Sequence, residues 1–356
     1  MTWLGEQLGR IADDMPERDL AARALEIHQR RRRNFMALTA AAVVVVTVLA
    51  ATVAVRALPA EPRAAAPPPE QSTITVGMMT TLESVPVVVA LNKGYFKEEG
   101  LTVEWRSIPG VAAAVSLAES GIADLAQTDY ATVFTANEAG KKFKIVSSLH
   151  QAAPGSFAIA VDTKSKIRTV TDLKRKRVAI SGLSGLGQLT LTAVLKRAGL
   201  TLGDVRLAVV PDSDMLRVLG KGQVDAALLA EPLINVGREV KRVRIVADPM
   251  TQEFANLYTG GMMATDEWVR EHPRTVAAFQ RALVKAQRLI ATDPQQMRDA
   301  LYRFARVPQK WAAGVAFGSY PAHLDLTELQ RVADLARAYK LIKHPVDVRN
   351  TVVKGG

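Results

Sequence analysis

One segment of this chain occurs twice in loosely similar form. "GLTVEW…SLAESGIADLAQTD" returns further along the chain as "GLTLGDVRLAVV…RVLGKGQVDAALLAEP". In each copy a glycine follows a helical stretch and an aspartate leads into an apolar run, as at Gly121 and Asp124 and again at Gly222 and Asp225. We predict that each glycine ends a helix in the left-handed conformation and that each aspartate serves the turn. The same supersecondary unit used twice predicts two similar lobes.

Short β runs alternate with helical stretches from Thr73 onward. "ITVGMM", "LTVEWRSI" and "ADLAQT" are typical of strands, whereas "PVVVALNKGYFKEE" and "VAAAVSLAESG" are typical of helices. The alternation predicts an α/β fold of two Rossmann-like lobes, with mainly parallel sheets and a central cleft. Ligands of such sheets bind beyond the carboxyl ends of the strands. The loops expected at the cleft are therefore residues 79–85, 108–112, 128–131, 182–187, 211–214 and 230–233.

An uncharged apolar run extends from Phe35 to Val55. As a helix it reaches about 31 Å, enough to cross a bilayer. Residues 30–33 are four arginines directly before it, and such charge stays on the cytoplasmic side. We predict a retained single-pass anchor in the plasma membrane, with the N-terminus cytoplasmic and the binding domain extracytoplasmic. Cleavage after the small residues 64–66 is the alternative, which Pro67 disfavours.

The N-terminal regions divide by composition. We assign residues 1–33 to a cytoplasmic tail, 34–55 to the transmembrane anchor and 56–72 to a Pro/Ala-rich linker that acts as a semi-rigid spacer.

Charge and residue usage exclude several function classes. The net charge is +11, and residues 1–70 hold nine Lys and Arg against eight Asp and Glu, so the excess belongs to the exported part. These charges are scattered with few aromatics among them, so we expect no nucleic-acid partner. The absence of Cys excludes disulfides, thiolate metal sites and cysteine nucleophiles. The five His have no metal-ligand spacing, so we expect no metal, no cofactor and no catalysis.

Five segments together resemble a known family. They are "VPVVVALNKGYFKEEGLTVEW", "SGIADLAQTDYATV", "TVTDLKRKRVAISG", "GQVDAALLAEP" and "DEWVREHPRTVAAFQRAL". They look like the solute-binding proteins of ABC importers, in the group that takes up nitrate, sulfonates, taurine and thiamine pyrimidine precursors. The resemblance implies the type II periplasmic-binding fold, a small-molecule solute and an ABC transporter permease as partner. We expect a monomer.

The same resemblance implies how the exported part is divided. Lobe 1 comprises residues 73–160 plus 259–350, and lobe 2 comprises residues 161–258. The segments near Ser156–Ala160 and Tyr258–Met263 are expected to form the hinge.

Ligand contacts carried over from the family fall in the loops at the strand ends. The predicted ligand-binding residues are Thr80, Thr81, Glu83, Ser84, Thr128, Asp129, Tyr130, Ser181, Gly182, Ser184, Asp212, Glu231 and Tyr258. Helix capping is the alternative role for residues 80–84 and for Asp129, and a salt bridge is the alternative for Glu231. The loop "SGLSGLGQ" precedes a helix, where backbone N–H groups can hold an anion. Ala230 stands where many relatives have an aromatic residue, which puts a stacking contact in doubt.

The charge of the ligand stays open at this point. An amine or amidine suits the site if two of Glu83, Asp129 and Glu231 line the cleft, whereas the glycine loop favours an anion, and taurine carries both charges. The retained tail also permits a second hypothesis, a membrane-anchored ligand sensor. An enzyme on the same fold is the third, although the resembling pyrimidine synthase uses a Cys-containing motif that this chain lacks.

Overall fold

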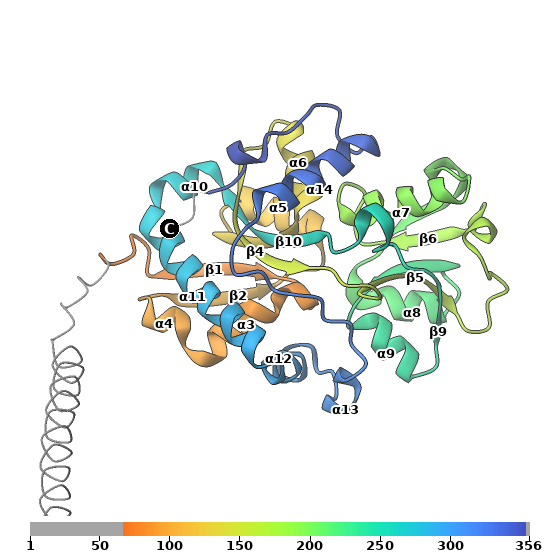
Figure 1. The fold of residues 1–356 in the computed structure, drawn as a ribbon, viewed down its shortest axis with the longest axis horizontal. Coiled ribbons are helices and arrows are strands. Elements are labelled where there is room, and N and C mark those ends of the chain that lie inside the picture. Colours follow the sequence, from red (N-terminus) through yellow and green to blue (C-terminus); the bar gives the residue numbers. More distant parts are fainter. Residues whose placement is uncertain (1–66, 354–356) are drawn as a thin grey trace, which may run out of the picture. The chain divides into compact units, whose positions relative to one another are not determined.

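The computed structural model describes residues 67–353, which contain two five-stranded sheets lying side by side (Figure 1). The first sheet has the order β2 (Thr102–Ser107), β1 (Thr73–Met78), β3 (Leu125–Asp129), β10 (Tyr258–Thr265), β4 (Phe143–Gln151). The second has the order β7 (Arg206–Val209), β6 (Arg177–Ile180), β8 (Ala226–Ala230), β5 (Phe157–Asp162), β9 (Val243–Ala247). Each sheet is the centre of one lobe.

Both sheets are mixed: four of the five strands run in one direction, as predicted, and one strand runs against them. In the first sheet β1 pairs parallel with β2 and β3, but β10 runs antiparallel to both β3 and β4. In the second, β6 pairs parallel with β7 and β8, but β5 runs antiparallel to β8 and β9. The antiparallel strand is in each case the one that enters the lobe directly from the other lobe. The predicted α/β class with two similar lobes is confirmed.

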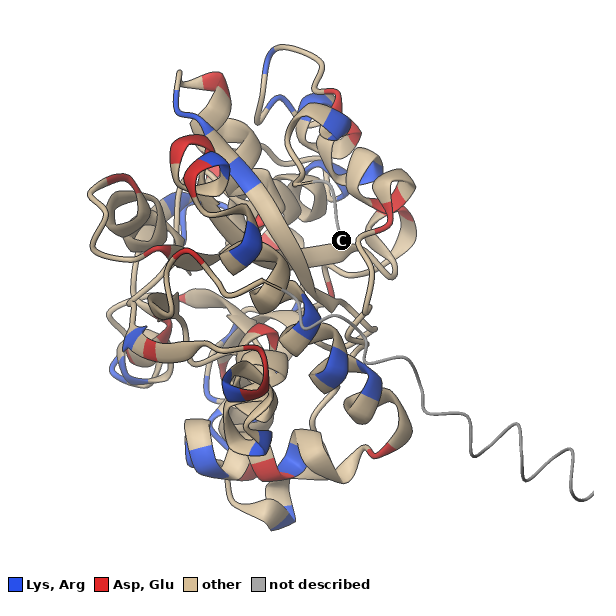
Figure 2. Ribbon diagram, turned by 90° about the vertical axis from the view of Figure 1, so that its left-hand side faces the viewer, with Lys and Arg blue, Asp and Glu red and all other residues tan. Residues whose placement is uncertain are grey.

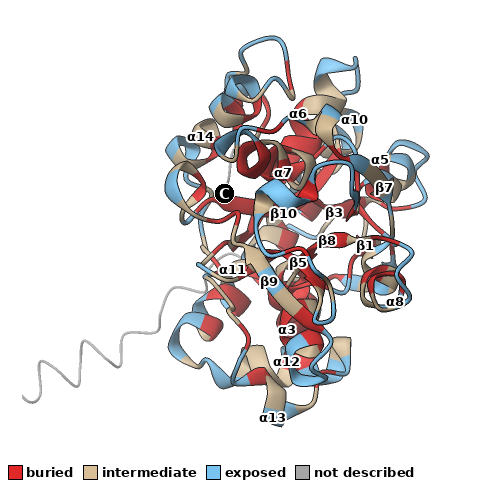
Figure 3. Ribbon diagram, turned by 90° about the vertical axis from the view of Figure 1, so that its right-hand side faces the viewer, coloured by how far each residue is buried: buried red, intermediate tan, exposed pale blue. Residues whose placement is uncertain are grey.

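Helices cover both faces of each sheet, which gives each lobe two apolar layers. The helices of lobe 1 are α3 (Val85–Lys93), α4 (Tyr95–Glu98), α5 (Val111–Glu119), α6 (Tyr130–Glu138), α10 (Asp266–Glu271), α11 (Pro273–Thr292), α12 (Gln295–Ala305), α13 (Gln309–Ala312) and α14 (Leu326–Ala338). Those of lobe 2 are α7 (Leu186–Arg197), α8 (Met215–Gly220) and α9 (Leu233–Glu239). Adjacent residues of β10 show the alternation of a strand, because Met262 packs on the α3 and α11 side and Met263 on the α5, α6 and α14 side. Figure 3 shows the buried residues on the strands and the inward sides of the helices, with exposed residues at the turns.

The sequence repeat corresponds to the same local structure in both lobes. Gly121 and Gly222 follow α5 and α8 and adopt left-handed φ angles of 70° and 68°. The carboxylate of Asp124 accepts a hydrogen bond from the first-sheet backbone at Thr75 N, at 2.7 Å. The carboxylate of Asp225 accepts the equivalent bond from Arg177 N at 2.8 Å. The predicted turn roles of these residues are confirmed.

The chain passes between the two sheets at residues 152–156, after β4, and again at residues 248–257, before β10. The hinge segments predicted from the sequence lie a few residues later, within β5 and β10 themselves. Residues 157–160, expected in lobe 1, therefore belong to a strand of the second sheet. A third segment, residues 309–319, lies against both lobes, because Trp311 O accepts a bond from Asn235 Nδ2 of α9 at 2.6 Å.

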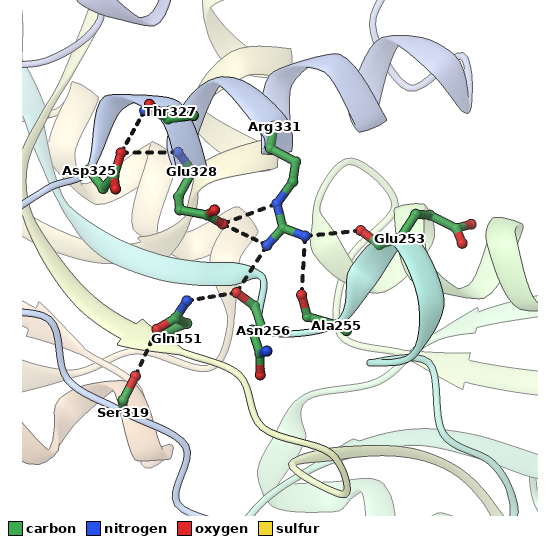
Figure 4. A network of polar contacts seen from close by, with 9 residues as sticks. All are labelled: Gln151, Glu253, Ala255, Asn256, Ser319, Asp325, Thr327, Glu328 and Arg331. Carbon is green, nitrogen blue, oxygen red and sulfur yellow. Dashed lines mark hydrogen bonds and ion pairs between the residues drawn. The ribbon is translucent and has the colours of Figure 1, made fainter.

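A guanidinium group holds the second crossing against lobe 1 (Figure 4). Arg331 of α14 donates to the carbonyl oxygens of Glu253, Ala255 and Asn256 at 3.3, 3.1 and 3.0 Å. Asn256 O also accepts from the Gln151 side chain, at 2.8 Å, at the end of β4. Because one rigid planar group bonds three carbonyl groups within four residues, the position of this crossing is fixed relative to α14.

The predicted linker ends in a docked position. The Glu70 carboxylate accepts hydrogen bonds from Arg274 N at 3.0 Å and Thr275 N at 2.8 Å, in the first turn of α11. Partial burial raises the pKa of Glu70, but these backbone bonds outweigh it and lower the pKa to about 2. The last residues assigned to the spacer are therefore part of the folded domain.

The membrane prediction falls on residues outside the described part of the chain. The tail at 1–33, the anchor at 34–55 and most of the linker lie there. Among the helices within residues 67–353, none combines the length and apolar character needed to cross a bilayer. On the face shown in Figure 2, Lys and Arg are interspersed with Asp and Glu.

Candidate functional site

A cavity lies between the two sheets, where strand ends of both lobes face each other. The cavity measures about 70 Å³. Lobe 1 lines it with Met79, Thr81, Glu83, Val111, Gln127, Thr128, Asp129, Thr259 and Gly260. Lobe 2 lines it with Phe157, Ser181, Leu186, Gly187, Asp212, Leu228, Leu229 and Ala230. Both lobes thus supply polar and apolar walls.

A buried glutamine fixes the loop that follows β1. Gln127 Oε1 accepts hydrogen bonds from Met79 N at 2.9 Å and from Ser84 Oγ at 2.5 Å, and Gln127 Nε2 donates to Thr81 Oγ1 at 2.8 Å. These three bonds span the loop from its first residue to the start of α3. They hold it in the conformation that places Glu83 at the cavity.

Glu83 lies against the entering strand β10. Its Oε1 is 3.5 Å from Thr259 Oγ1 and 3.7 Å from His150 Nδ1. His150 is 1% exposed, and its Nε2 is 2.7 Å from the carbonyl oxygen of Phe317, which can only accept. Nε2 therefore donates to this carbonyl oxygen, and Nδ1 lies 2.8 Å from Thr259 Oγ1. Gly260 permits this approach, since an added Cβ would lie 3.1 Å from Glu83 Cγ.

Asp129 joins the two lobes. It is the N-cap of α6, where its carboxylate accepts from Thr132 N at 2.7 Å and from Thr132 Oγ1 at 2.8 Å. The same carboxylate accepts from Leu186 N at 3.0 Å, at the N-terminus of α7 in lobe 2. A Cβ at Gly185 would lie 2.3 Å from Thr132 Oγ1 and 2.5 Å from Asp129 Oδ2, so this contact requires glycine.

The positive end of α7 therefore holds a carboxylate of the protein itself. The sequence predicted that the loop "SGLSGLGQ" presents N–H groups to an anionic ligand, and the N–H of Leu186 is bonded to Asp129. Thr135 Oγ1 of α6 adds a second bond between the lobes, to Ser184 O at 2.7 Å. This loop serves contact between the lobes in the described conformation.

Burial between the lobes raises the pKa of two cavity carboxyls. Burial raises the pKa of Asp129 to about 6, with Glu83 adding a smaller contribution in the same direction, although the bonds from Thr132 and Leu186 oppose it. Burial and the negative charge of Glu83 together raise the pKa of Asp212 to about 6. Three acidic groups thus interact within one cavity.

Comparison with known proteins assigns the family. Residues 81–297 match the family described as NMT1/THI5 like. The chain belongs to this family. It is 25% identical over 277 residues to the taurine-binding periplasmic protein of Escherichia coli (strain K12), covering 74% of this chain and 81% of that protein. It is 25% identical over 333 residues to the riboflavin-binding protein RibY of Chloroflexus aurantiacus, covering 84% of this chain and 92% of that protein.

The fold is similar to that of the alkanesulfonate-binding protein SsuA from Xanthomonas axonopodis pv. citri bound to MOPS, with a TM-score of 0.68 at 22% identity. The similarity covers 80% of this chain and 99% of that one. The predicted family and the periplasmic-binding fold are confirmed. The relatives named here are binding proteins.

The structure brings part of the predicted site together. The predicted residues that line the cavity are Thr81, Glu83, Thr128, Asp129, Ser181 and Asp212. All six loops expected at the cleft contribute lining residues. Their contact with a solute stays a prediction.

The other predicted residues of this NMT1/THI5-like chain lie elsewhere. Thr80 lines an outer groove, Ser84 is bonded to Gln127, and Tyr130 and Tyr258 are buried in the core beneath α14. Gly182 packs on Val111 across the lobes, and Ser184 accepts a bond from Thr135 through its backbone.

Glu231, also predicted at the ligand, is 3% exposed. Its carboxylate accepts hydrogen bonds from Asn235 N at 3.0 Å and from Ala316 N at 3.4 Å, so it contacts the third linking segment. Burial raises the pKa of Glu231 to about 7.

Sequence reasoning missed the residues that antiparallel strands bring to the cavity. Thr259 and Gly260 open β10, and Phe157 opens β5, so these strands present their first residues to the cleft. The sequence prediction placed the ligand contacts mainly in loops after strands, and it did not include the fact that one strand of each sheet begins at the cleft. Gln127 gave a usable signal, since a polar side chain within an apolar strand is unusual.

Replacing Asp212 by Asn is expected to stabilise the solute-free protein at pH 7.5 by about 1–2 kcal/mol, because it removes a buried charge that is partly screened by solvent. The folded-state pKa, about 6, lies above the reference value of 3.8, so ionisation destabilises the fold above pH 6. The advantage of D212N should shrink as the pH falls from 6 to 4. Urea unfolding across this range measures it.

Asp214→Asn is the matched control. Asp214 is paired with Arg217 at 3.0 Å and its side chain is 41% exposed, so the change should stay within about 0.5 kcal/mol at every pH. Equal changes in the free energy of unfolding for the two substitutions would contradict the conclusion that the ionised Asp212 carboxylate destabilises the fold.

Proposed function

We propose that this protein is a membrane-tethered, extracytoplasmic solute-binding protein. It captures a small polar organic solute by closure of its two lobes and delivers the solute to an ABC importer. The observation that carries the proposal is the cavity between the strand ends of both lobes, which has polar side chains on each wall. The binding functions named for its relatives support the same class of function.

Lobe closure is supported by the contacts on the α6 and α7 side of the cleft. They combine two hydrogen bonds, from Leu186 N to Asp129 and from Thr135 to Ser184 O, with apolar packing of α7 against α6. Such bonds exchange readily for bonds to water, so they can break and reform as lobes move. A solute held by both walls favours the closed arrangement because it binds that arrangement better.

An outer groove continues from the cavity and provides a path for the solute. It measures about 560 Å³ and shares Met79 and Asp212 with the cavity. Lobe 1 contributes Trp311 and Arg306 to this groove, and lobe 2 contributes Pro232. The inner cavity suits a small solute, and the groove gives room for a longer one.

The tether belongs to the same proposal. An uncharged run of 21 residues behind four arginines fits a retained anchor with the N-terminus inside. A tethered binding protein stays close to its permease, which raises the effective concentration of loaded protein at the importer.

Solute binding is expected to raise the melting temperature of the full-length protein in detergent. A solute at a hundred times its dissociation constant stabilises by about 2.7 kcal/mol, which shifts the melting temperature of a domain of this size by roughly 4–5 °C. The panel contains taurine, alkanesulfonates, nitrate, amines, amino-pyrimidines and riboflavin. No shift with any member at millimolar concentration would count against solute binding.

The tether predicts a defined protease pattern. In spheroplasts, added protease should digest the domain at residues 67–356, while a tag at residue 1 stays protected until the membrane is dissolved. Recovery of a soluble mature protein starting near residue 67 would show that the span is cleaved.

Gly185→Ala is expected to prevent lobe contact, because the added Cβ would overlap Thr132 and Asp129. The affinity for the best solute of the panel should fall at least tenfold, equivalent to about 1.4 kcal/mol, and small-angle scattering should show a larger radius of gyration. Gly203→Ala is the control, since its nearest neighbour is Thr201 Oγ1 at 3.6 Å in lobe 2. Unchanged affinity in G185A would argue against closure through this contact.

A further inference from the structure

We propose that the cavity selects solutes that carry a protonated amine or amidinium group, held between Glu83 of lobe 1 and Asp212 of lobe 2. The inference rests on the proposed function and narrows its solute class. Nitrate and simple sulfonates, which are anions without an amine, are therefore not expected to bind.

The charges on the cavity wall are all of one sign. Glu83, Asp129 and Asp212 line it, and the described lining residues include no lysine, arginine or histidine. A cation placed here interacts with carboxylates that are shielded from water, where the attraction is stronger than on the surface. An anion placed here meets no opposite charge.

The backbone donor best placed for an anion is already in use. Leu186 N, at the positive end of α7, donates to Asp129 at 3.0 Å. Asp129 is thereby satisfied by three hydrogen bonds, two of them from Thr132. Glu83 and Asp212 are therefore the carboxylates with capacity left for a ligand.

A buried hydroxyl supplies a second, independent sign of a ligand. Thr128 lines the cavity and is 2% exposed, and its Oγ1 has no hydrogen-bond partner within residues 67–353. Buried polar atoms are nearly always paired, so the unpaired hydroxyl of this lining residue is available to a polar group of a ligand. An ammonium or amidinium N–H can donate to it while also bonding a carboxylate.

The geometry favours an organic cation over a metal ion. Within the described residues, no group of three or more His, Cys, Asp and Glu side chains is close enough to share a metal ion. Carboxylates on opposite walls instead suit a cation with several N–H donors, which can donate to more than one oxygen.

The same two carboxylates connect cation binding to lobe closure. Glu83 and Asp212 lie on different lobes and are close enough for Glu83 to raise the pKa of Asp212. Without a solute their repulsion opposes closure. A cation between them replaces repulsion by two attractions, so it stabilises the closed arrangement selectively.

Matched pairs of solutes test the inference on the full-length protein by isothermal titration. Taurine is compared with ethanesulfonate, and β-alanine with propionate, since each pair differs by the amine alone. Putrescine and nitrate complete the panel. We expect at least a tenfold preference for the member that carries the amine, with putrescine binding and nitrate not.

Glu83→Gln and Asp212→Asn should each lower the affinity for the amines at least tenfold. Asp214→Asn, which lies outside the cavity, should leave this affinity unchanged. The wild-type pH profile gives a second readout if a variant fails to fold. Asp212 lies near Glu83 and lines the outer groove together with Arg306. Because the pKa of Asp212 is about 6, a cation that binds at lower pH must displace a proton from this carboxyl group. Amine affinity should therefore fall between pH 7 and 5.

The outcomes separate the inference from the proposed function. Binding of the desamino sulfonate, propionate or nitrate as tightly as the amines, or affinity that rises on acidification, overturns the cation inference and leaves solute binding standing. If no solute of the panel binds, whether amine or anion, the cation inference and the proposed function are both overturned.

Discussion

The path of the chain between the lobes is the constraint on which the site depends. The chain leaves the first sheet after β4, enters the second with β5 and returns with β10. A strand that arrives from the other lobe starts at the cleft, whereas the parallel strands of the same sheet end there. Each sheet must therefore contain one strand of opposite direction. As a result the cavity receives carboxyl-end loops and strand beginnings together, and Thr259 comes to lie beside Glu83.

Asp129 illustrates how one side chain serves local and global structure. As the N-cap of α6 it satisfies a helix terminus of lobe 1, and through Leu186 N it satisfies a terminus of lobe 2. A carboxylate at a helix N-terminus is favourable, yet burying it between lobes raises its pKa. The opposing effects leave a contact that holds the lobes together without making the closed arrangement irreversible. Such a balance is what a protein that must release its solute requires.

The sequence was informative where local patterns decide the structure. The alternation of strands and helices, the glycines with left-handed φ at positions 121 and 222, and the six loops at the cleft all follow from short-range patterns. Strand direction does not, because period-two alternation is the same for parallel and antiparallel pairing. Contacts between the lobes could not be predicted from the sequence either. Nothing near Gly185 in the sequence indicates that Asp129 approaches it, and Glu231, predicted at the ligand, lies instead against Ala316.

The basic balance of residues 71–356 and the acidic cavity are compatible because their charges act over different ranges. Residues 71–356 carry 37 Lys and Arg against 27 Asp and Glu, and many of these charges lie on exposed helices and turns. In physiological salt their fields decay within about 8 Å, so they contribute little inside a cavity walled by protein. The carboxylates of Glu83 and Asp212 act at contact distance in a medium of lower dielectric constant. The net charge of the chain therefore does not predict the charge of its solute, which on our proposal depends on the few ionisable groups of the cavity wall.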